Sequence, residues 1–198
     1  MFVTREAGEL DLNIVYYGAP LSGKTTNLQY IHANVDSASR VELMSIEPFG
    51  DRILFFTLLR PHLGWLKGLK PRFVLCIVAG EVTHEASLGL VLERAHGVVF
   101  VADSQAERLR DNVAFLASLT GQLAKLGRDL SEHPFVLQCN KQDLPNVLTP
   151  EVLRERLGQD DVPYLGSVAR ERRGTLSTLR TIIGLVVRKM WQEATSGP

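Results

Sequence analysis

The sequence predicts an α/β domain with a mostly parallel six-stranded sheet, one strand of which is antiparallel, and with helices on both faces of the sheet. Short apolar runs alternate along the chain with longer segments in which apolar residues recur at helical spacing. The runs are apolar almost throughout, which is typical of parallel strands buried on both faces. Two neighbouring runs are joined only by a segment containing proline and glycine, 60–71, which indicates an antiparallel hairpin.

Six segments fit strands in composition and length. They are Leu12–Tyr17, Arg52–Leu59, Arg72–Val78, Gly97–Asp103, Pro134–Cys139 and Tyr164–Val168. Arg52–Leu59 and Arg72–Val78 form the expected antiparallel pair.

Helices are expected between most of these strands. The first runs from about Lys24 to Val35, after a glycine-rich turn. Thr149 and Pro150 fit an N-cap followed by proline at the first helical position. The other helices are indicated by apolar residues that share one helix face: Leu88, Val91, Leu92 and Ala95; Leu109, Val113, Leu116 and Leu123; and Leu176, Leu179, Ile183, Val186 and Met190.

The composition limits the classes of function. The 198 residues are 45% hydrophobic and 22% charged, as in soluble globular proteins, and the pattern predicts a single domain over 1–198 with its core at about 10–190. Lys+Arg and Asp+Glu are both 22, which argues against a nucleic-acid partner. Cys76 and Cys139 lie in apolar runs and are expected to be buried thiols in a reducing, cytoplasmic compartment. No apolar run reaches about 18 residues, so direct membrane insertion is not expected.

The segment Gly18-Ala-Pro-Leu-Ser-Gly23-Lys24-Thr25 fits the phosphate-binding pattern G-x-x-x-x-G-K-[ST]. An expected strand precedes it and an expected helix follows it, as the pattern requires. Glycines let backbone N–H groups turn toward phosphate oxygens, and the helix N-terminus adds its positive end. Lys24 would reach the β and γ phosphates, and the Thr25 hydroxyl would ligate Mg²⁺.

A second motif, Asn140-Lys141-Gln142-Asp143, directly follows the expected strand Pro134–Cys139. The Asp143 carboxylate could accept hydrogen bonds from the ring N–H and the exocyclic amine of guanine. Adenine does not offer these two donors in that arrangement, so such a site would reject it strongly.

With these motifs in place, the chain resembles the Ras-like small GTPases, and it is most similar to the bacterial MglA-type polarity and gliding-motility GTPases. The resemblance covers roughly residues 10 to 190. The segments that carry it are Ile14–Gly18, Leu21–Asn27, Arg52 with Leu54–Phe56, Gly97–Ser104 and Asn140–Asp143. It implies a GTP/GDP switch that recognises a polarity or motility effector, and an activating partner similar to the MglB-type roadblock/LC7 dimers.

The resemblance also implies roles for individual residues. Arg52 resembles the family's intrinsic arginine finger, and Glu81 stands where the family has a water-orienting glutamine. Thr25 is the implied ligand of Mg²⁺. The implied nucleotide-binding residues are Gly18, Leu21, Ser22, Gly23, Lys24, Thr25, Thr26, Gly80, Asn140, Lys141, Asp143, Val168 and Ala169. The backbone N–H of Ala169 would lie near the carbonyl of the base.

Three positions depart from the family pattern. Ile53 replaces a threonine of the first switch, and Ile77 stands where Ras-like proteins have the aspartate of D-x-x-G. Glu81 adds negative charge beside the γ-phosphate, and its ionised form cannot donate a hydrogen bond. Nucleotide binding should survive, because Mg²⁺ accepts water in place of protein ligands. Hydrolysis is expected to be slow or partner-dependent.

Two other interpretations of the function remain open from the sequence. A pseudo-GTPase would hold nucleotide statically, or not at all, and act as an interaction module. An ATP-using P-loop kinase or ATPase is disfavoured, because Asp143 would have no role in it. The five histidines show no metal-ligand spacing and are expected at the surface or in loops. Trp65 fits either a loop anchor or a partner contact.

Overall fold

The computed structural model describes residues 8–35, 43–48, 51–59, 65–66, 68–79 and 85–195. Within them the strands are β1 (Glu9–Tyr17), β2 (Met44–Ile46), β3 (Arg52–Leu59), β4 (Lys70–Ala79), β5 (Ala95–Asp103), β6 (Phe135–Asn140) and β7 (Tyr164–Gly166). The helices are α1 (Lys24–Asn34), α2 (Glu85–Glu93), α3 (Leu109–Lys125), α4 (Pro150–Arg156) and α5 (Thr175–Thr195). Short 3₁₀ turns cover Ala106–Arg108, Leu130–Glu132 and Ala169–Glu171.

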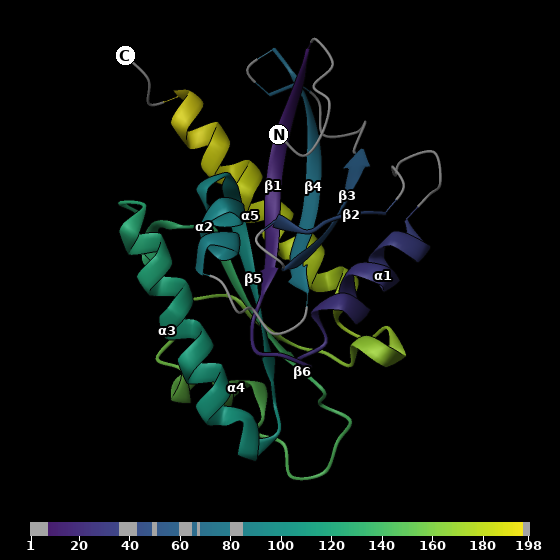
Figure 1. Cartoon of the computed structure of the whole chain (residues 1–198), viewed down its shortest axis with the longest axis vertical. Helices are drawn as coiled ribbons and strands as arrows, with labels where there is room; N and C mark the ends of the chain where they lie inside the picture. Colours follow the sequence, from purple (N-terminus) through teal and green to yellow (C-terminus); the bar gives the residue numbers. More distant parts are fainter. Residues whose placement is uncertain are drawn as a thin grey trace.

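The described strands form one sheet in the order β2-β3-β4-β1-β5-β6-β7 (Figure 1). All neighbouring pairs from β4 to β7 are parallel, whereas β3 is antiparallel to both β2 and β4. The expected antiparallel strand is therefore confirmed as β3, and the expected hairpin joins it to β4.

The described sheet has seven strands, so the expected count of six was one too low. The additional strand, β2, has only three residues, and the side chain of Met44 is 50% exposed. Such a short edge strand has no continuous apolar run. A second difference concerns Ala95, which begins β5 and does not continue the face of α2.

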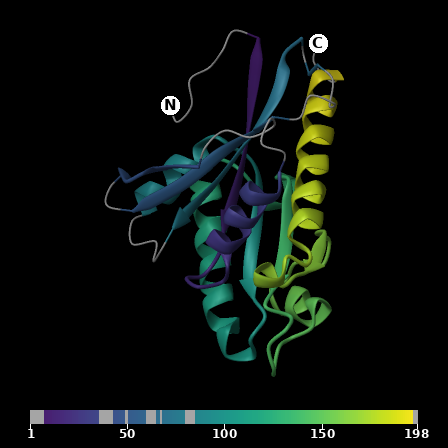
Figure 2. The ribbon, with the colours of Figure 1, turned by 90° about the vertical axis from the view of Figure 1, so that its right-hand side faces the viewer.

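Two hydrophobic layers cover the sheet because successive side chains of each strand point to opposite faces. In β1, Leu12, Ile14 and Tyr16 belong to one core and Val15 and Tyr17 to the other. The first core contains the apolar residues of α1 and α5, and the second contains those of α2, α3 and α4. Figures 1 and 2 show the corresponding arrangement, with α2 and α3 on one side of the sheet and α5 on the other.

The packed face of α3 differs by one position from the expected one. Leu116, Leu119 and Leu123 are buried, but Val113 is 47% exposed. The preceding residue, Asn112, is fully buried instead, and it hydrogen-bonds the end of β5. A polar contact therefore sets the orientation of the first turn of α3.

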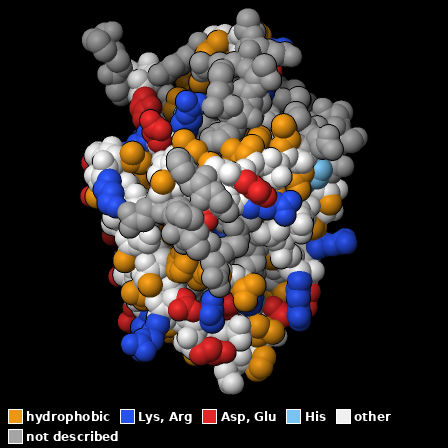
Figure 3. Space-filling model, viewed as in Figure 1, with side chains coloured by type: hydrophobic (Ala, Val, Ile, Leu, Met, Phe, Trp, Pro, Cys, Tyr) orange, Lys and Arg blue, Asp and Glu red, His pale blue; other side chains and the backbone are white. Residues whose placement is uncertain are grey.

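Both cysteines are free and buried, as expected. Acidic and basic side chains are interspersed on the face shown in Figure 3. Among the described helices, none combines the length and the apolar character needed to cross a bilayer.

Candidate nucleotide-binding site

The two sequence motifs meet at one edge of the sheet. The segment Gly18–Gly23 follows β1, whereas Asn140 ends β6, and β5 lies between these two strands. The three strands are parallel, so their carboxyl ends lie at the same edge. In open α/β sheets this edge is where ligands bind.

Two glycines let the phosphate-binding segment Gly18–Thr25, the P-loop, pack closely against the ends of β5 and β6. Gly18 has φ 146°, and a Cβ there would lie 2.3 Å from the Val101 carbonyl oxygen. Gly23 has φ 102°, and a Cβ there would lie 2.2 Å from Asn140 Nδ2. Neither position can accept a side chain without displacing its neighbour.

Lys24 begins α1, and its side chain folds back across the P-loop. Its Nζ donates to the carbonyl oxygens of Gly18 at 2.9 Å and Ala19 at 2.8 Å. The residue is only 5% exposed. Burial lowers the pKa of Lys24 from 10.5 to about 8. The ammonium group is thus held over the loop Gly18–Gly23 and is poorly solvated there.

The N-terminus of α1 is open to an anion. Gly23 is its N-cap, and no side chain caps the first turn. The first N–H groups of a helix need partners from outside the helix, and phosphate oxygens are suitable acceptors. Thr25 is half-buried and Thr26 is exposed, both in this turn. Leu21 is 85% exposed and adopts a left-handed conformation with φ 63°.

Asn140 joins the two motifs. Its Nδ2 donates to the Ser22 carbonyl at 2.7 Å. Its Oδ1 accepts hydrogen bonds from the Ser167 hydroxyl at 3.1 Å and the Ala169 N–H at 2.9 Å. The Ala169 N–H, which the family resemblance places near the base carbonyl, is therefore engaged with Asn140 in this structure. Val168, the other residue of that loop, is 2% exposed.

The remaining charged groups of Asn140–Asp143 have ionic partners. Lys141 Nζ lies 2.6 Å from Asp103 Oδ2. Asp143 is paired with Arg170, whose Nη2 lies 2.6 Å from Asp143 Oδ2. The Arg170 side chain is 66% exposed, whereas that of Asp143 is only 9% exposed. An exposed cation thus covers a mostly buried carboxylate.

The sequence reasoning missed several polar residues that support this site. Asp103, with its side chain 1% exposed, faces both Lys141 and Arg108. Deeper in the molecule, Gln138 Nε2 donates to Asn27 Oδ1 at 3.0 Å and to Thr178 Oγ1 at 3.2 Å. A polar residue in the middle of a buried strand was the available signal for Gln138. The partner of Asp103 is remote in sequence and left no local signal.

The expected catalytic residues are only partly described. Arg52 is exposed at the start of β3, in register with Ala79 of β4. Because Tyr16 of β1 is in register with Ile77, Arg52 is level with the start of the P-loop. Two strand spacings, about 10 Å, separate them. Gly80 and Glu81 lie outside the described residues.

The two substituted isoleucines lie in the cores. Ile53 is 1% exposed and Ile77 is fully buried, and they belong to opposite layers of the sheet. Both are hydrocarbon side chains that take part in packing, and neither can supply a ligand for Mg²⁺ or a phosphate.

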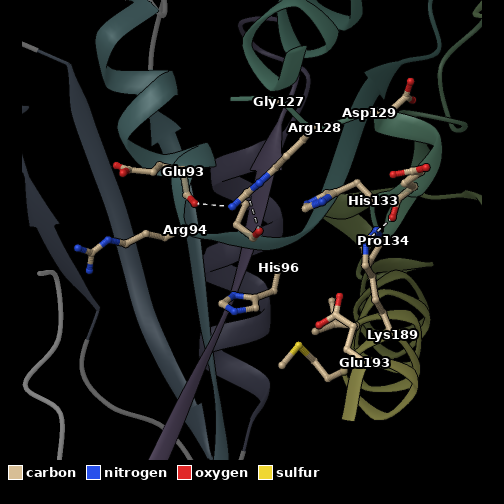
Figure 4. Close-up of a pocket in the computed structure, with 14 residues that line it drawn as sticks. Glu93, Arg94, His96, Gly127, Arg128, Asp129, His133, Pro134, Lys189 and Glu193 are labelled. Atoms are coloured by element: carbon tan, nitrogen blue, oxygen red, sulfur yellow. Dashed lines mark hydrogen bonds between the residues drawn. The ribbon is translucent and has the colours of Figure 1, made fainter. Parts of the chain in front are cut away.

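A separate cavity of about 320 Å³ lies at the amino ends of β5 and β6, away from the P-loop (Figure 4). Arg128 donates there to the carbonyl oxygens of Leu92 and Glu93, at the end of α2, and of Ala95, which begins β5. Arg128 therefore connects the end of α2, the start of β5 and the loop that follows α3.

Two histidines line this cavity: His133 lies in the turn before β6, as expected for the histidines, whereas His96 lies in strand β5 and is half-buried. The Asn13 N–H donates to His96 Nδ1 at 3.0 Å, at the point where the β1–β5 register shifts. Burial lowers the pKa of His96, and Arg128 lowers it further. Burial also lowers the pKa of His133 to about 4, with a contribution from Lys189. Both rings are therefore neutral at pH 7.

Comparison with known proteins identifies the family. The chain is 42% identical over 189 residues to the mutual gliding-motility protein MglA of Myxococcus xanthus (strain DK1622), an alignment that spans 96% of this chain and 97% of that protein. The chain belongs to the MglA family of Ras-like small GTPases. No protein-family model matches the chain. For an MglA-family protein, the described sheet with β3 antiparallel and the P-loop after β1 is the expected architecture, so the fold class predicted from sequence is confirmed.

Proposed function

We propose that this protein is a cytoplasmic guanine-nucleotide switch of the MglA type, which cycles between GTP and GDP to control cell polarity or motility. The observation that carries the proposal is the 2.7 Å hydrogen bond from Asn140 Nδ2 to the Ser22 carbonyl. It joins a phosphate-binding segment to a base-binding segment in one site. The name of the Myxococcus relative refers to gliding motility, which supports the proposed process.

In this proposal the diphosphate is bound by the backbone N–H groups of Leu21–Thr26 and by the Lys24 ammonium. Thr25 is the protein ligand of Mg²⁺. The donor set fits this metal, because Mg²⁺ is usually held by one or two protein oxygens together with phosphates and water. Within the described residues, no group of three acidic, histidine or cysteine side chains offers a competing site. Bound Mg²⁺ would neutralise charge on the phosphates.

At the other end of the site, the Asp143 carboxylate accepts from the two guanine donors. Arg170, which pairs with Asp143, is mostly exposed and would move aside for the base. Lys141 and the loop containing Val168 and Ala169 complete the proposed base site, and the Ala169 N–H would have to leave Asn140 Oδ1 to reach the base carbonyl. Gly80, which lies outside the described residues, is proposed to bind the nucleotide as well.

Hydrolysis is proposed to be slow without a partner. Arg52 serves as the arginine finger. A roadblock-type MglB-like dimer supports the two switch segments, Ser45–Leu59 and Gly80–Leu88, during hydrolysis. The burial of Ile53 and Ile77 supports weak intrinsic activity, because neither can replace the missing polar groups. Turnover should not exceed about 10⁻⁴ s⁻¹, the scale of unaided small GTPases.

The first experiment measures nucleotide identity and affinity. Freshly purified protein is denatured and the released nucleotide is identified, and GDP and ADP are then compared by competition with a fluorescent GDP analogue. We expect GDP to bind at least about a hundredfold more tightly than ADP, and Asp143→Ala to remove most of this preference. Equal affinities for GDP and ADP in the unmutated protein would exclude the guanine-site assignment.

The second experiment separates the switch from a pseudo-GTPase, the alternative that the buried Ile53 and Ile77 favour. Single-turnover GTP hydrolysis is followed with and without an MglB-type dimer, for the unmutated protein, Arg52→Ala and Glu81→Gln. A switch shows activator-stimulated turnover that Arg52→Ala lowers, and Glu81→Gln raises turnover if the added charge is the defect. Turnover that stays undetectable with the activator would support the pseudo-GTPase.

A further inference from the structure

Arg108 contacts the P-loop from outside both nucleotide-binding motifs. It ends the 3₁₀ turn Ala106–Arg108 and is the N-cap residue of α3. Its Nη2 donates to the Pro20 carbonyl oxygen at 2.9 Å, a contact between residues 88 positions apart in the sequence. Pro20 lies in the middle of the P-loop, between Gly18 and Gly23.

Two carboxylates fix the orientation of this guanidinium. Arg108 Nη1 lies 2.6 Å from Asp111 Oδ2, and its Nε lies 3.9 Å from Asp103 Oδ2. The Arg108 side chain is 30% exposed, whereas that of Asp103 is 1% exposed. A guanidinium is planar and presents its donors in a rigid geometry, so the close ion pair with Asp111, assisted by the longer electrostatic contact with Asp103, helps to keep Nη2 directed at Pro20.

The Pro20 carbonyl belongs to the peptide unit that precedes a strained residue. Leu21 has φ 63°, in the left-handed region that residues with a Cβ rarely occupy. Packing does not hold Leu21 there, because the residue is 85% exposed. The conformation of this peptide therefore needs support from another part of the chain, and the Arg108 hydrogen bond supplies it.

The geometry points to Arg108 as a positioning residue that keeps the P-loop in its phosphate-binding conformation before nucleotide arrives. This inference rests on the proposed nucleotide binding. A protein whose binding-competent conformation is only partly populated has a dissociation constant raised by the inverse of that fraction. Bound phosphates also hold the loop, so the effect of Arg108 is greatest in the nucleotide-free protein.

Arg108 acts on the phosphate end of the site. It contacts the P-loop directly, whereas it meets the base-binding segment only through Asp103, whose closer partner is Lys141 at 2.6 Å. Loss of Arg108 should therefore weaken binding of diphosphates without changing selectivity for the base. Inosine diphosphate tests this, because it lacks the exocyclic amine from which Asp143 would accept a hydrogen bond.

The test compares Arg108→Ala with Arg110→Ala, which removes an exposed arginine of the same helix. Dissociation constants for GDP and inosine diphosphate are measured on nucleotide-free protein by displacement of a fluorescent GDP analogue. Arg108→Ala should weaken both nucleotides about tenfold, equivalent to about 1.4 kcal/mol. Their ratio should not change. Arg110→Ala should stay within about twofold of the unmutated protein, and Arg108→Lys should recover part of the loss by retaining a charged donor.

A second background tests whether Arg108 acts through the strain at Leu21. Leu21→Gly removes the Cβ and permits positive φ without penalty. In that background Arg108→Ala should cost less than about threefold in GDP affinity. Thermal unfolding of the nucleotide-free variants is measured alongside to verify that each is folded.

Three results would overturn the inference, and they separate it from the proposed function. Unchanged GDP affinity in Arg108→Ala would refute the positioning role and leave nucleotide binding standing. An equal loss in the Leu21→Gly background, or an altered ratio of GDP to inosine diphosphate, would show a general structural role for Arg108. Failure of the unmutated protein to bind either nucleotide would refute both.

Discussion

The buried ammonium of Lys24 makes nucleotide affinity dependent on pH in a predictable direction. Lys24 is 5% exposed and donates only to carbonyl oxygens, and its burial lowers its pKa from 10.5 to about 8. A bound diphosphate favours the charged form and raises that pKa again. Binding near pH 8 therefore takes up a proton, and affinity must fall as the pH rises through the pKa of the free protein.

The size of the effect follows from the same value. If only the charged form binds, the apparent dissociation constant is multiplied by one plus the ratio of neutral to charged lysine. With a pKa of about 8, this factor is about 1.1 at pH 7, about 2 at pH 8 and about 11 at pH 9. GDP should thus bind about tenfold more weakly at pH 9 than at pH 7.

Titration calorimetry at constant ionic strength, in two buffers of different ionisation enthalpy, measures both the affinity and the proton uptake. Lys24→Arg is the matched control, because a guanidinium stays charged throughout this range. Its weaker binding should not change between pH 7 and pH 9. A dissociation constant that is constant in the unmutated protein, or an equal slope in Lys24→Arg, would refute the reasoning.

Three further predictions follow from other parts of the structure. Gly23→Ala places a Cβ 2.2 Å from Asn140 Nδ2, so GDP binding should be lost and the melting temperature lowered; Gly121→Ala, in open space on α3, should leave both intact or raise stability slightly. Because burial lowers the pKa of His133 to about 4, the folded protein binds fewer protons than the unfolded chain between pH 6.5 and 4. Stability should therefore fall as the pH drops through that range, by up to about 3 kcal/mol from this group, and the fall should be smaller in His133→Asn. Hydrogen exchange across Met44–Leu59 should differ between GDP, a non-hydrolysable GTP analogue and an added MglB-type dimer; equal protection in all three would contradict a switch.

Patterns that are local in the sequence predicted most of the fold. Long apolar strands such as β5 and β6 were evident, because every residue of β6 and nearly every residue of β5 is buried. The short strand β2 was missed, because its three residues are exposed or half-buried at the edge of the sheet. The face of α3 was misjudged at Val113, because a buried amide, Asn112, occupies the position where an apolar residue was expected.

The candidate site shows the same division. The glycines and Lys24 of the P-loop follow a pattern confined to eight residues, and Asp143 belongs to a similarly compact motif. The contact between Arg108 and Pro20 spans 88 positions, and an arginine at the start of an amphipathic helix gives no local indication of such a partner. Arg108 and Pro20 meet only in the folded chain, so no short sequence pattern contains both.

Hydrogen bonds connect both ends of α2 to other parts of the chain. The carbonyl oxygens of Leu92 and Glu93, the last residues of α2, accept hydrogen bonds from Arg128, as does that of Ala95 in β5, so this end of the helix is tied to the loop after α3. The opposite end carries Ser87, whose hydroxyl donates to the Pro48 carbonyl at 3.3 Å, next to β2. Helix α2 therefore connects the loop after α3 to Pro48 beside β2, and a change at one of these two places can be transmitted to the other through the helix.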